Sequence, residues 1–331
     1  MTTGRETTLY DPLLHDVDLP LTATFHPLGF PVAIATNSPH VIEAASETWA
    51  VYRPEFATRP IQLRIAVQPT GGLAPEPVFR SQRHSFSIVS DRDNFAFYDS
   101  DSLFGFCFVS EKTAADHDWF RFHFLETMAY MLLAQRHAMQ VHAACVAHGD
   151  AGVLLGGASG SGKSTLAWAC ARAGWTYITD DGAWLLPETN GTVVGRFHNI
   201  RLRGDAPSLF PELASFLTRP RPNGKVSMEV PVSAFPQIRT ASRCQVTCVV
   251  LLDRRSGAPA HATPADPEDV IDVLIRDMPS YGADVRERYE EAVRRLLVRP
   301  AYRMIYHNLD EAVCLLSQLA PGTNPDETKH F

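Results

Sequence analysis

The sequence lacks the long apolar stretch that a membrane span needs, because none of its apolar runs reaches about 18 residues. Residues 1–11 contain acidic side chains and no apolar segment like that of a secretory signal, so we expect a cytoplasmic protein that contacts no membrane. A basic excess is also missing, since 37 Asp and Glu against 30 Lys and Arg give a formal net charge of −7. That balance argues against a general nucleic-acid-binding protein, which needs a basic surface.

Cysteine pairs at redox or zinc-finger spacing are missing too. None of the six cysteines forms a Cys-x-x-Cys motif, and most lie in apolar stretches, so we expect reduced core residues. Internal repeats and low-complexity tracts are likewise not visible. What remains is an ordinary globular composition, with 45% hydrophobic and 20% charged residues over 331 positions. This length favours two domains, which we place at residues 1–112 and 118–331.

The first domain has the pattern of an α+β module. Short apolar or alternating segments at residues 30–35, 61–67, 85–89, 95–98 and 103–109 predict strands, the last three as a meander. Asn37-Ser38-Pro39 predicts the start of a helix that runs to about Ala50. No recognisable chemical motif lies in this module. Residues 117–137 then show helical spacing of aromatic and Met side chains, which predicts a core helix that begins the second domain.

The strongest motif is a glycine-rich loop at residues 157–164 that matches G-x-x-x-x-G-K-[ST] in full. An apolar strand is predicted before it, at residues 152–156, and a helix after it, at residues 164–173. In this context backbone N–H groups of the loop point at phosphate oxygens, and the helix N-terminus adds its positive dipole. The motif therefore predicts an α/β nucleotide-binding domain that uses ATP and Mg²⁺. The predicted nucleotide-binding residues are Gly157, Ala158, Ser159, Gly160, Ser161, Gly162, Lys163, Ser164 and Thr165.

A pair of acids follows the next predicted strand, residues 175–179. Asp180 and Asp181 come only seventeen residues after Lys163, at the strand end where ligands bind in such sheets. One carboxylate can accept the proton of an attacking hydroxyl while the other, with Ser164, holds Mg²⁺. We do not assign the two roles. An acidic exit from a strand into a turn would give the same sequence.

These residues, together with His142 on a strand before the loop, resemble the catalytic domain of HPr kinase/phosphorylase over residues 120–260. The match is closest to the HPr kinase-related serine kinases, which include enzymes of lasso-peptide and other modified-peptide pathways. The resemblance implies that His142 is a site residue and that Asp180 and Asp181 supply the base and metal functions.

One departure limits this resemblance. HPr enzymes carry a Glu-x-Arg-Gly signature, whereas this chain reads Asn-Ile-Arg-Leu-Arg-Gly over residues 199–204, so the acidic residue is missing although Arg203-Gly204 is kept. The resemblance therefore supports neither a glutamate metal ligand nor the reverse, phosphate-consuming reaction, and it does not imply HPr as the substrate. Two basic residues complete the expected site: Arg201, to neutralise charge on the transferred phosphoryl group, and Lys225, on a loop that can close over substrate.

We expect an ATP-dependent kinase for a serine or threonine hydroxyl of a protein or peptide, with the first domain recognising the acceptor. Two alternatives stay open. One is a small-molecule or carboxykinase-like phosphotransferase, and the other is a regulatory nucleotide-binding module. The sequence also leaves open the choice between ATP and GTP and whether the chain forms homo-oligomers.

Overall fold

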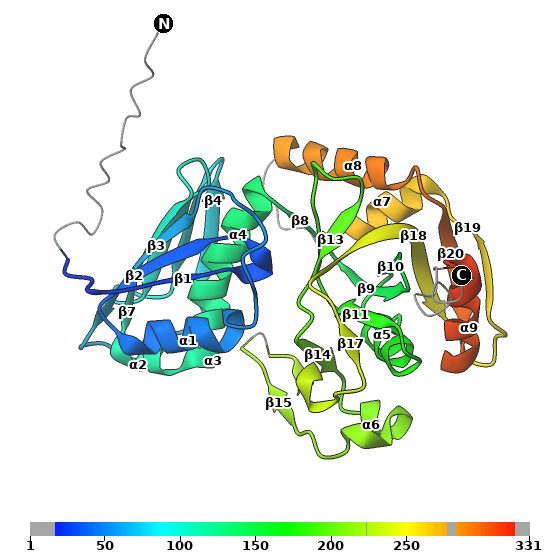
Figure 1. Ribbon diagram of the computed structural model, residues 1–331. Coiled ribbons are helices and arrows are strands. Elements are labelled where there is room, and N and C mark those ends of the chain that lie inside the picture. Colours follow the sequence, from blue (N-terminus) through cyan, green and yellow to red (C-terminus); the bar gives the residue numbers. More distant parts are fainter. Residues whose placement is uncertain (1–16, 223, 277–282, 322–331) are drawn as a thin grey trace, which may run out of the picture. The chain divides into compact units, whose positions relative to one another are not determined.

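The computed structural model describes residues 17–222, 224–276 and 283–321 (Figure 1). It divides into two compact units, and the boundary lies between Leu132 and Leu133. The expected start of the second domain at residue 118 differs from this boundary. The helical segment that begins there is held to the first unit, because Thr48 Oγ1 donates to Glu126 Oε1 at 2.8 Å and Trp49 Nε1 donates to Tyr130 Oη at 3.2 Å.

The first unit contains a mixed sheet with the strand order β1-β2-β3-β7-β6-β5-β4. Its strands are β1 (Leu21–Phe25), β2 (Val32–Thr36), β3 (Ile61–Gln68), β4 (Val78–Gln82), β5 (Ser85–Val89), β6 (Phe95–Asp99) and β7 (Phe104–Ser110). The predicted meander is confirmed, because β5, β6 and β7 pair antiparallel in sequence order. Strands β1 and β4 were not predicted from the sequence.

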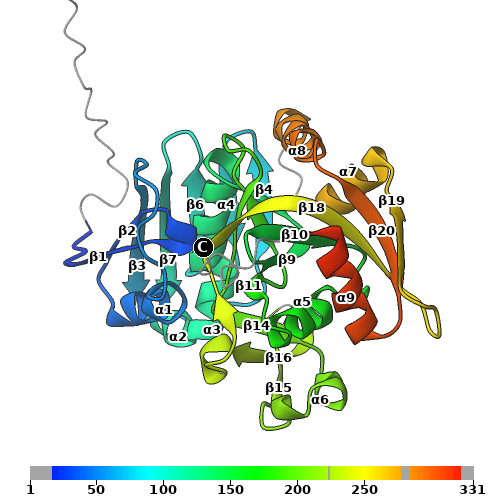
Figure 2. The same cartoon turned by 45° about the vertical axis from the view of Figure 1, so that its right-hand side comes forward.

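The helices of this unit are α1 (Pro39–Trp49), α2 (Glu111–Ala115) and α3 (His117–Phe120), followed by a π-helical turn (Arg121–Leu125) and α4 (Glu126–Arg136). The helix that we predicted over residues 117–137 is thus confirmed as far as Arg136, and it contains a π-helical turn after its first turn. Its apolar side chains are core residues as expected, since Phe120, Phe124 and Met128 are fully buried. Helices α1, α2 and α3 pack together, and they lie side by side in both views (Figures 1 and 2).

The second unit is built on a larger sheet with the strand order β17-β11-β9-β10-β18-β13-β12-β8 and with β20 and β19 added beside β18. The strands are β8 (Met139–Val141), β9 (Ala143–His148), β10 (Ala151–Gly156), β11 (Thr176–Thr179), β12 (Ala183–Leu185), β13 (Thr192–Val194), β17 (Arg239–Thr240), β18 (Arg243–Arg254), β19 (His261–Pro264) and β20 (Ala301–Tyr306). A small separate sheet has the order β14-β16-β15, with β14 (Asn199–Leu202), β15 (Thr218–Pro220) and β16 (Val226–Pro231).

Helices cover both faces of the large sheet. Helices α5 (Lys163–Arg172) and α9 (Leu309–Leu319) share one core with alternate residues of β9, β10 and β18, and they lie together in Figure 2. Helix α7 (Pro267–Ile275) packs on the other face, where a Cβ at Gly156 would lie 3.2 Å from Leu274 Cδ2. The remaining helices are α6 (Ala206–Leu209) and α8 (Ala283–Leu296). No helix in the described part of the chain has the length and apolar composition to span a bilayer.

The register of β9 brings distant parts of the chain to one edge of this sheet. Strand β9 is antiparallel to both neighbours, with Ala143 opposite Gly156 of β10 and Cys145 opposite Thr179 of β11. The start of β9 therefore lies at the edge where β10 and β11 end. His142, the glycine loop and the two aspartates follow or precede these strand ends directly, so the sheet places all three at the same edge.

The core under this edge depends on α5. Trp168 is fully buried, and its ring lies 5.2 Å from that of Phe235 in a T-shaped contact. We expect Trp168→Ala to lower the free energy of unfolding by about 3–5 kcal/mol, because the lost ring leaves a cavity. Leu217→Ala is the control, since Leu217 is 75% exposed, and we expect a change within about 0.5 kcal/mol. Urea denaturation followed by circular dichroism measures both, and equal effects would contradict this description of the core.

Candidate functional site

The glycine loop connects β10 to α5, so the predicted strand, loop and helix are confirmed. Gly162 has φ +94° at the N-terminus of α5, and a Cβ there would collide with Tyr306 Oη. Tyr306 donates to the Ser161 carbonyl at 2.9 Å from the end of β20. Burial raises the pKa of Tyr306 to about 12, so the phenol stays a neutral donor. The hydroxyl of Tyr306 therefore holds the glycine loop in place, and the sequence analysis did not identify this residue.

Lys163 lies in the first turn of α5 and is only 7% exposed. Its ammonium donates to the carbonyl oxygens of Gly157 at 2.8 Å and of Ala158 at 3.3 Å, and so curls back over the loop. Ser161 Oγ is buried in the same loop with no hydrogen-bond partner among the described residues. Gly162 offers no side chain to cap the first N–H groups of α5. A buried cation, an orphaned hydroxyl and an uncapped helix N-terminus together suit a bound anion.

Two arginines extend the positive charge around the loop. The guanidinium of Arg203 lies against Gly160, since a Cβ there would be 3.4 Å from Arg203 Nη2. Arg254 passes Gly162, with its Cδ 3.8 Å from where a Cβ would be. We did not predict Arg254. A signal was available in the sequence, because Arg254 ends the long apolar run that forms β18.

His142 and Asp181, two predicted site residues, pair with each other. His142 Nδ1 lies 3.0 Å from Asp181 Oδ1, although 39 positions separate them in the chain. Partial burial alone would raise the pKa of Asp181, but the hydrogen bond and charge of His142 lower it below its ordinary value. The positive charges of Lys163 and Arg201 act in the same direction. Asp181 is therefore ionised at neutral pH, and its side chain remains 48% exposed.

Asp180 has a different environment. It is 5% exposed, its Oδ2 accepts from the Arg201 N–H at 3.0 Å, and its Oδ1 lies 3.0 Å from the Tyr177 hydroxyl. Burial, followed by the negative charge of Asp181, raises the pKa of Asp180. Tyr177 is also 3.0 Å from the Asn199 carbonyl, and its single proton can serve only one of these two acceptors.

The two aspartates thus form an unequal pair, with Asp180 buried and held by the protein and Asp181 ionised and open to solvent. Ser164 follows Lys163 in the first turn of α5 and is partly buried. Its hydroxyl and the carboxylate of Asp181 are the oxygen ligands that Mg²⁺ prefers. The chemistry of these side chains fits a magnesium nucleotide, and the binding itself stays a prediction.

Arg201 contacts a carboxylate that the sequence analysis left out. Its Nε lies 3.7 Å from Glu229 Oε2, and Asn199 Nδ2 donates to Glu229 Oε1 at 3.0 Å. Arg201 and Glu229 are opposite each other in the β14–β16 pair. Glu229 therefore reaches Asn199 and Arg201 through the pairing of β14 with β16.

Lys225 lies in the turn between β15 and β16 and is exposed. Its predicted role as a mobile cation over the substrate stays a prediction. Ala158, Ser159 and Gly160 form the exposed tip of the glycine loop, and Thr165 lies partly buried in the first turn of α5.

Comparison with known proteins adds little to this description. No protein-family model matches the chain, and no curated protein matches its sequence. Among solved structures, the Hpr(Ser) kinase/phosphatase from Coxiella burnetii aligns over 54% of this chain and 89% of its own, with 13% identity and a TM-score of 0.29. A likeness at this level does not establish a shared fold or activity.

The pairing of His142 with Asp181 can be tested by titration. We expect His142→Gln to raise the pKa of Asp181, because the contacts that favour its ionised form are lost while its partial burial remains. In the wild type, this pairing stabilises the protein above the ordinary pKa of an aspartate and is lost as the pH falls through the lowered value. Carboxyl ¹³C chemical shifts measure the titration.

His148→Gln is the matched control, because His148 lies at the far end of β9, stacked on Trp175 at 4.7 Å. It should leave the titration of Asp181 unchanged. An unchanged pKa of Asp181 in His142→Gln would contradict the pairing.

Proposed function

We propose that this chain is an ATP-dependent kinase that transfers the γ-phosphoryl group to a serine or threonine hydroxyl of a protein or peptide. The observation that carries the proposal is the pairing of Asp181 with His142 at 3.0 Å, at the sheet edge where the glycine loop begins. A carboxylate at this place can accept a proton beside a predicted phosphate site, which is what phosphoryl transfer to an alcohol requires.

Lys163 and the loop would hold the triphosphate. On nucleotide binding, the Lys163 ammonium would exchange the carbonyls of Gly157 and Ala158 for oxygens of the β and γ phosphates. Arg203, which lies against Gly160, would neutralise charge that develops on the transferred group. Mg²⁺, held by the Ser164 hydroxyl, would neutralise charge on the same phosphates.

In the transfer step, the acceptor oxygen forms a bond to the γ phosphorus while the bond from that phosphorus to the oxygen of the β phosphate breaks. ADP leaves with the electron pair of the broken bond. The hydroxyl proton goes to Asp181, whose orientation His142 fixes through Nδ1. Asp180, with its raised pKa and its contacts to Tyr177 and Arg201, holds the strand end in place. The proposal therefore gives the proton-accepting role to Asp181.

Nucleotide binding should depend on Lys163. We expect Lys163→Ala to weaken ATP binding by about 10- to 150-fold, which corresponds to the 1.5–3 kcal/mol typical of a hydrogen bond to a charged group. Lys112→Ala removes the same charge from the first unit and should leave the affinity unchanged. Isothermal titration with Mg²⁺-ATP measures both variants. Unchanged binding in Lys163→Ala would rule out the loop as the nucleotide site.

The reaction itself is tested by identifying the phosphorylated product. The chain is incubated with Mg²⁺-ATP labelled at the γ position and with a library of serine- and threonine-containing peptides, and the products are fragmented by mass spectrometry. We expect an acid-stable, alkali-labile phosphate on an aliphatic hydroxyl. Asp181→Asn should lower the rate by about 10²–10⁴-fold, as loss of a general base does, with little change in ATP affinity.

Asp205→Asn, an exposed aspartate of the same unit, is the matched control and should retain full activity. Phosphate only on small metabolites would favour the small-molecule alternative. ATP hydrolysis with no phosphorylated product would favour a regulatory module. An acid-labile phosphate on histidine or aspartate, or a fully active Asp181→Asn, would overturn the proposed mechanism.

A further inference from the structure

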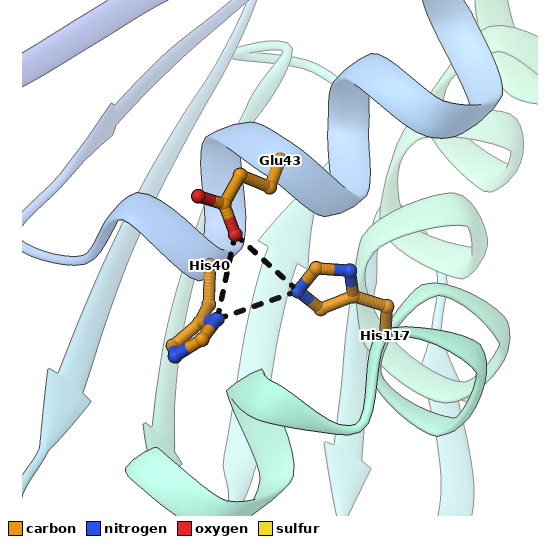
Figure 3. Close-up of side chains that lie close together, drawn as sticks. All are labelled: His40, Glu43 and His117. Atoms are coloured by element: carbon orange, nitrogen blue, oxygen red, sulfur yellow. Dashed lines mark hydrogen bonds and ion pairs between the residues drawn. The ribbon is translucent and has the colours of Figure 1, made fainter.

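A second group of chemically active side chains lies in the first unit, where the sequence showed no motif. His40, Glu43 and His117 turn their ligand atoms toward one point (Figure 3). His40 Nδ1 lies 3.4 Å from His117 Nε2 and 3.6 Å from Glu43 Oε2, and His117 Nε2 lies 3.9 Å from the same oxygen. We propose that these three residues bind a Zn²⁺ ion through two imidazole nitrogens and one carboxylate oxygen.

The spacing of these atoms suits tetrahedral zinc. With Zn–N bonds of about 2.0–2.1 Å, two tetrahedral ligand atoms lie about 3.4 Å apart, which is the separation of the two histidine nitrogens. The carboxylate is slightly farther away, on a side chain that is 58% exposed and free to move inward by the remaining few tenths of an ångström. Imidazole with carboxylate favours Zn²⁺ over Mg²⁺ and Ca²⁺, which take oxygen ligands.

The helices determine this convergence. His40 and Glu43 are three residues apart on α1 and therefore share one face. His117 is the first residue of α3, whose start is fixed because the Asp116 side chain accepts from the Trp119 N–H at 3.1 Å. The proposed ion would link α1 to α3, which pack against each other within the first unit.

A carboxylate behind His117 orients its imidazole ring. His117 Nδ1 lies 2.6 Å from Glu47 Oε1, and Glu47 Oε2 accepts from Arg121 Nη1 at 2.9 Å. An Nδ1–H that donates to Glu47 leaves the lone pair of Nε2 directed at His40, as carboxylates do behind metal-binding histidines. Two protonated nitrogens would not face each other at 3.4 Å, so at most one proton lies between the rings.

The site also has room for a fourth ligand. The side chains of His40 and His117 are 38% and 20% exposed, so solvent reaches the ion. An open depression of about 720 Å³ adjoins His117 and is lined also by Lys112, Asp116 and Asp118. Three protein ligands with a water in the fourth position is the arrangement of a zinc site that remains open to further ligands.

Metal titration of the full chain tests this site without reference to the kinase activity. The metal-stripped protein is titrated with ZnCl₂ against a chromophoric chelator of micromolar affinity. We expect one equivalent of Zn²⁺ to bind per chain, to be lost in His40→Ala and in His117→Ala, and to raise the Tm of the wild type only. Glu43→Gln, at an exposed position, should weaken binding without affecting folding.

Two further variants test whether the effect on zinc binding is specific to the proposed site. Glu47→Gln should weaken zinc binding by about 10- to 100-fold, as loss of a carboxylate behind a ligating histidine does. His84→Ala is the matched control, because His84 also lies near two carboxylates, those of Asp99 at 3.4 Å and Asp101 at 3.5 Å, and it should bind zinc like the wild type. Co²⁺ in place of Zn²⁺ should give tetrahedral d–d absorption bands without a thiolate charge-transfer band.

Three results would overturn the proposal. They are a wild type that takes no zinc from the chelator, His40→Ala and His117→Ala variants that bind it as well as the wild type, and a cobalt spectrum that shows thiolate ligation.

Discussion

The site of the second unit depends on one strand that runs against its neighbours. If β9 were parallel to β10 and β11, its first residue would lie at the far edge of the sheet. Because it is antiparallel, Ala143 pairs with Gly156, and the residue before it, His142, reaches the strand end where Asp181 begins the next turn. The glycine loop leaves from the same edge. Strand direction and register thus assemble three segments that are 15 to 40 positions apart in the chain.

Once this edge is assembled, burial gives neighbouring carboxylates different properties. Asp180 points into the protein, where Tyr177 and the backbone of Arg201 satisfy its oxygens and burial raises its pKa. Asp181 points toward His142 and solvent, and its pKa is lowered. Two adjacent acids of the same kind are thereby separated into one whose pKa is raised and one whose pKa is lowered. This difference between the two carboxylates is the basis on which we propose Asp181 as the proton acceptor.

Local patterns in the sequence predicted the helices and strands around the glycine loop. The strand at residues 152–156, the loop, the helix to residue 173 and the strand ending at Thr179 each agree with the structure to within about a residue, because glycine spacing and apolar runs define them. Strands β1 and β4 were missed because most of their residues are exposed and show no buried alternation. The two compact units divide after Leu132, and the sequence did not show this, because the contacts of Glu126 and Tyr130 with α1 span about 80 positions.

The site residues that could not be predicted from the sequence are brought together by contacts between distant parts of the chain. Glu229 reaches Asn199 and Arg201 only through the register of β14 with β16, and Tyr306 reaches the glycine loop only because β20 joins the sheet beside β18. His40 and His117 are 77 positions apart, so no motif contains both. In the sequence alone, each of these residues is an ordinary polar side chain on a strand or helix, because its contact partner is far away in the chain.

The central claim is that the glycine loop and the His142–Asp181 pair act on the same phosphate. The most direct measurement is a structure of the chain with Mg²⁺ and a non-hydrolysable ATP analogue. The account predicts the γ phosphate within hydrogen-bond distance of Lys163 Nζ, with its free face turned toward Asp181. A nucleotide bound away from the loop, or a γ phosphate turned away from Asp181 with no path for an acceptor hydroxyl, would contradict it.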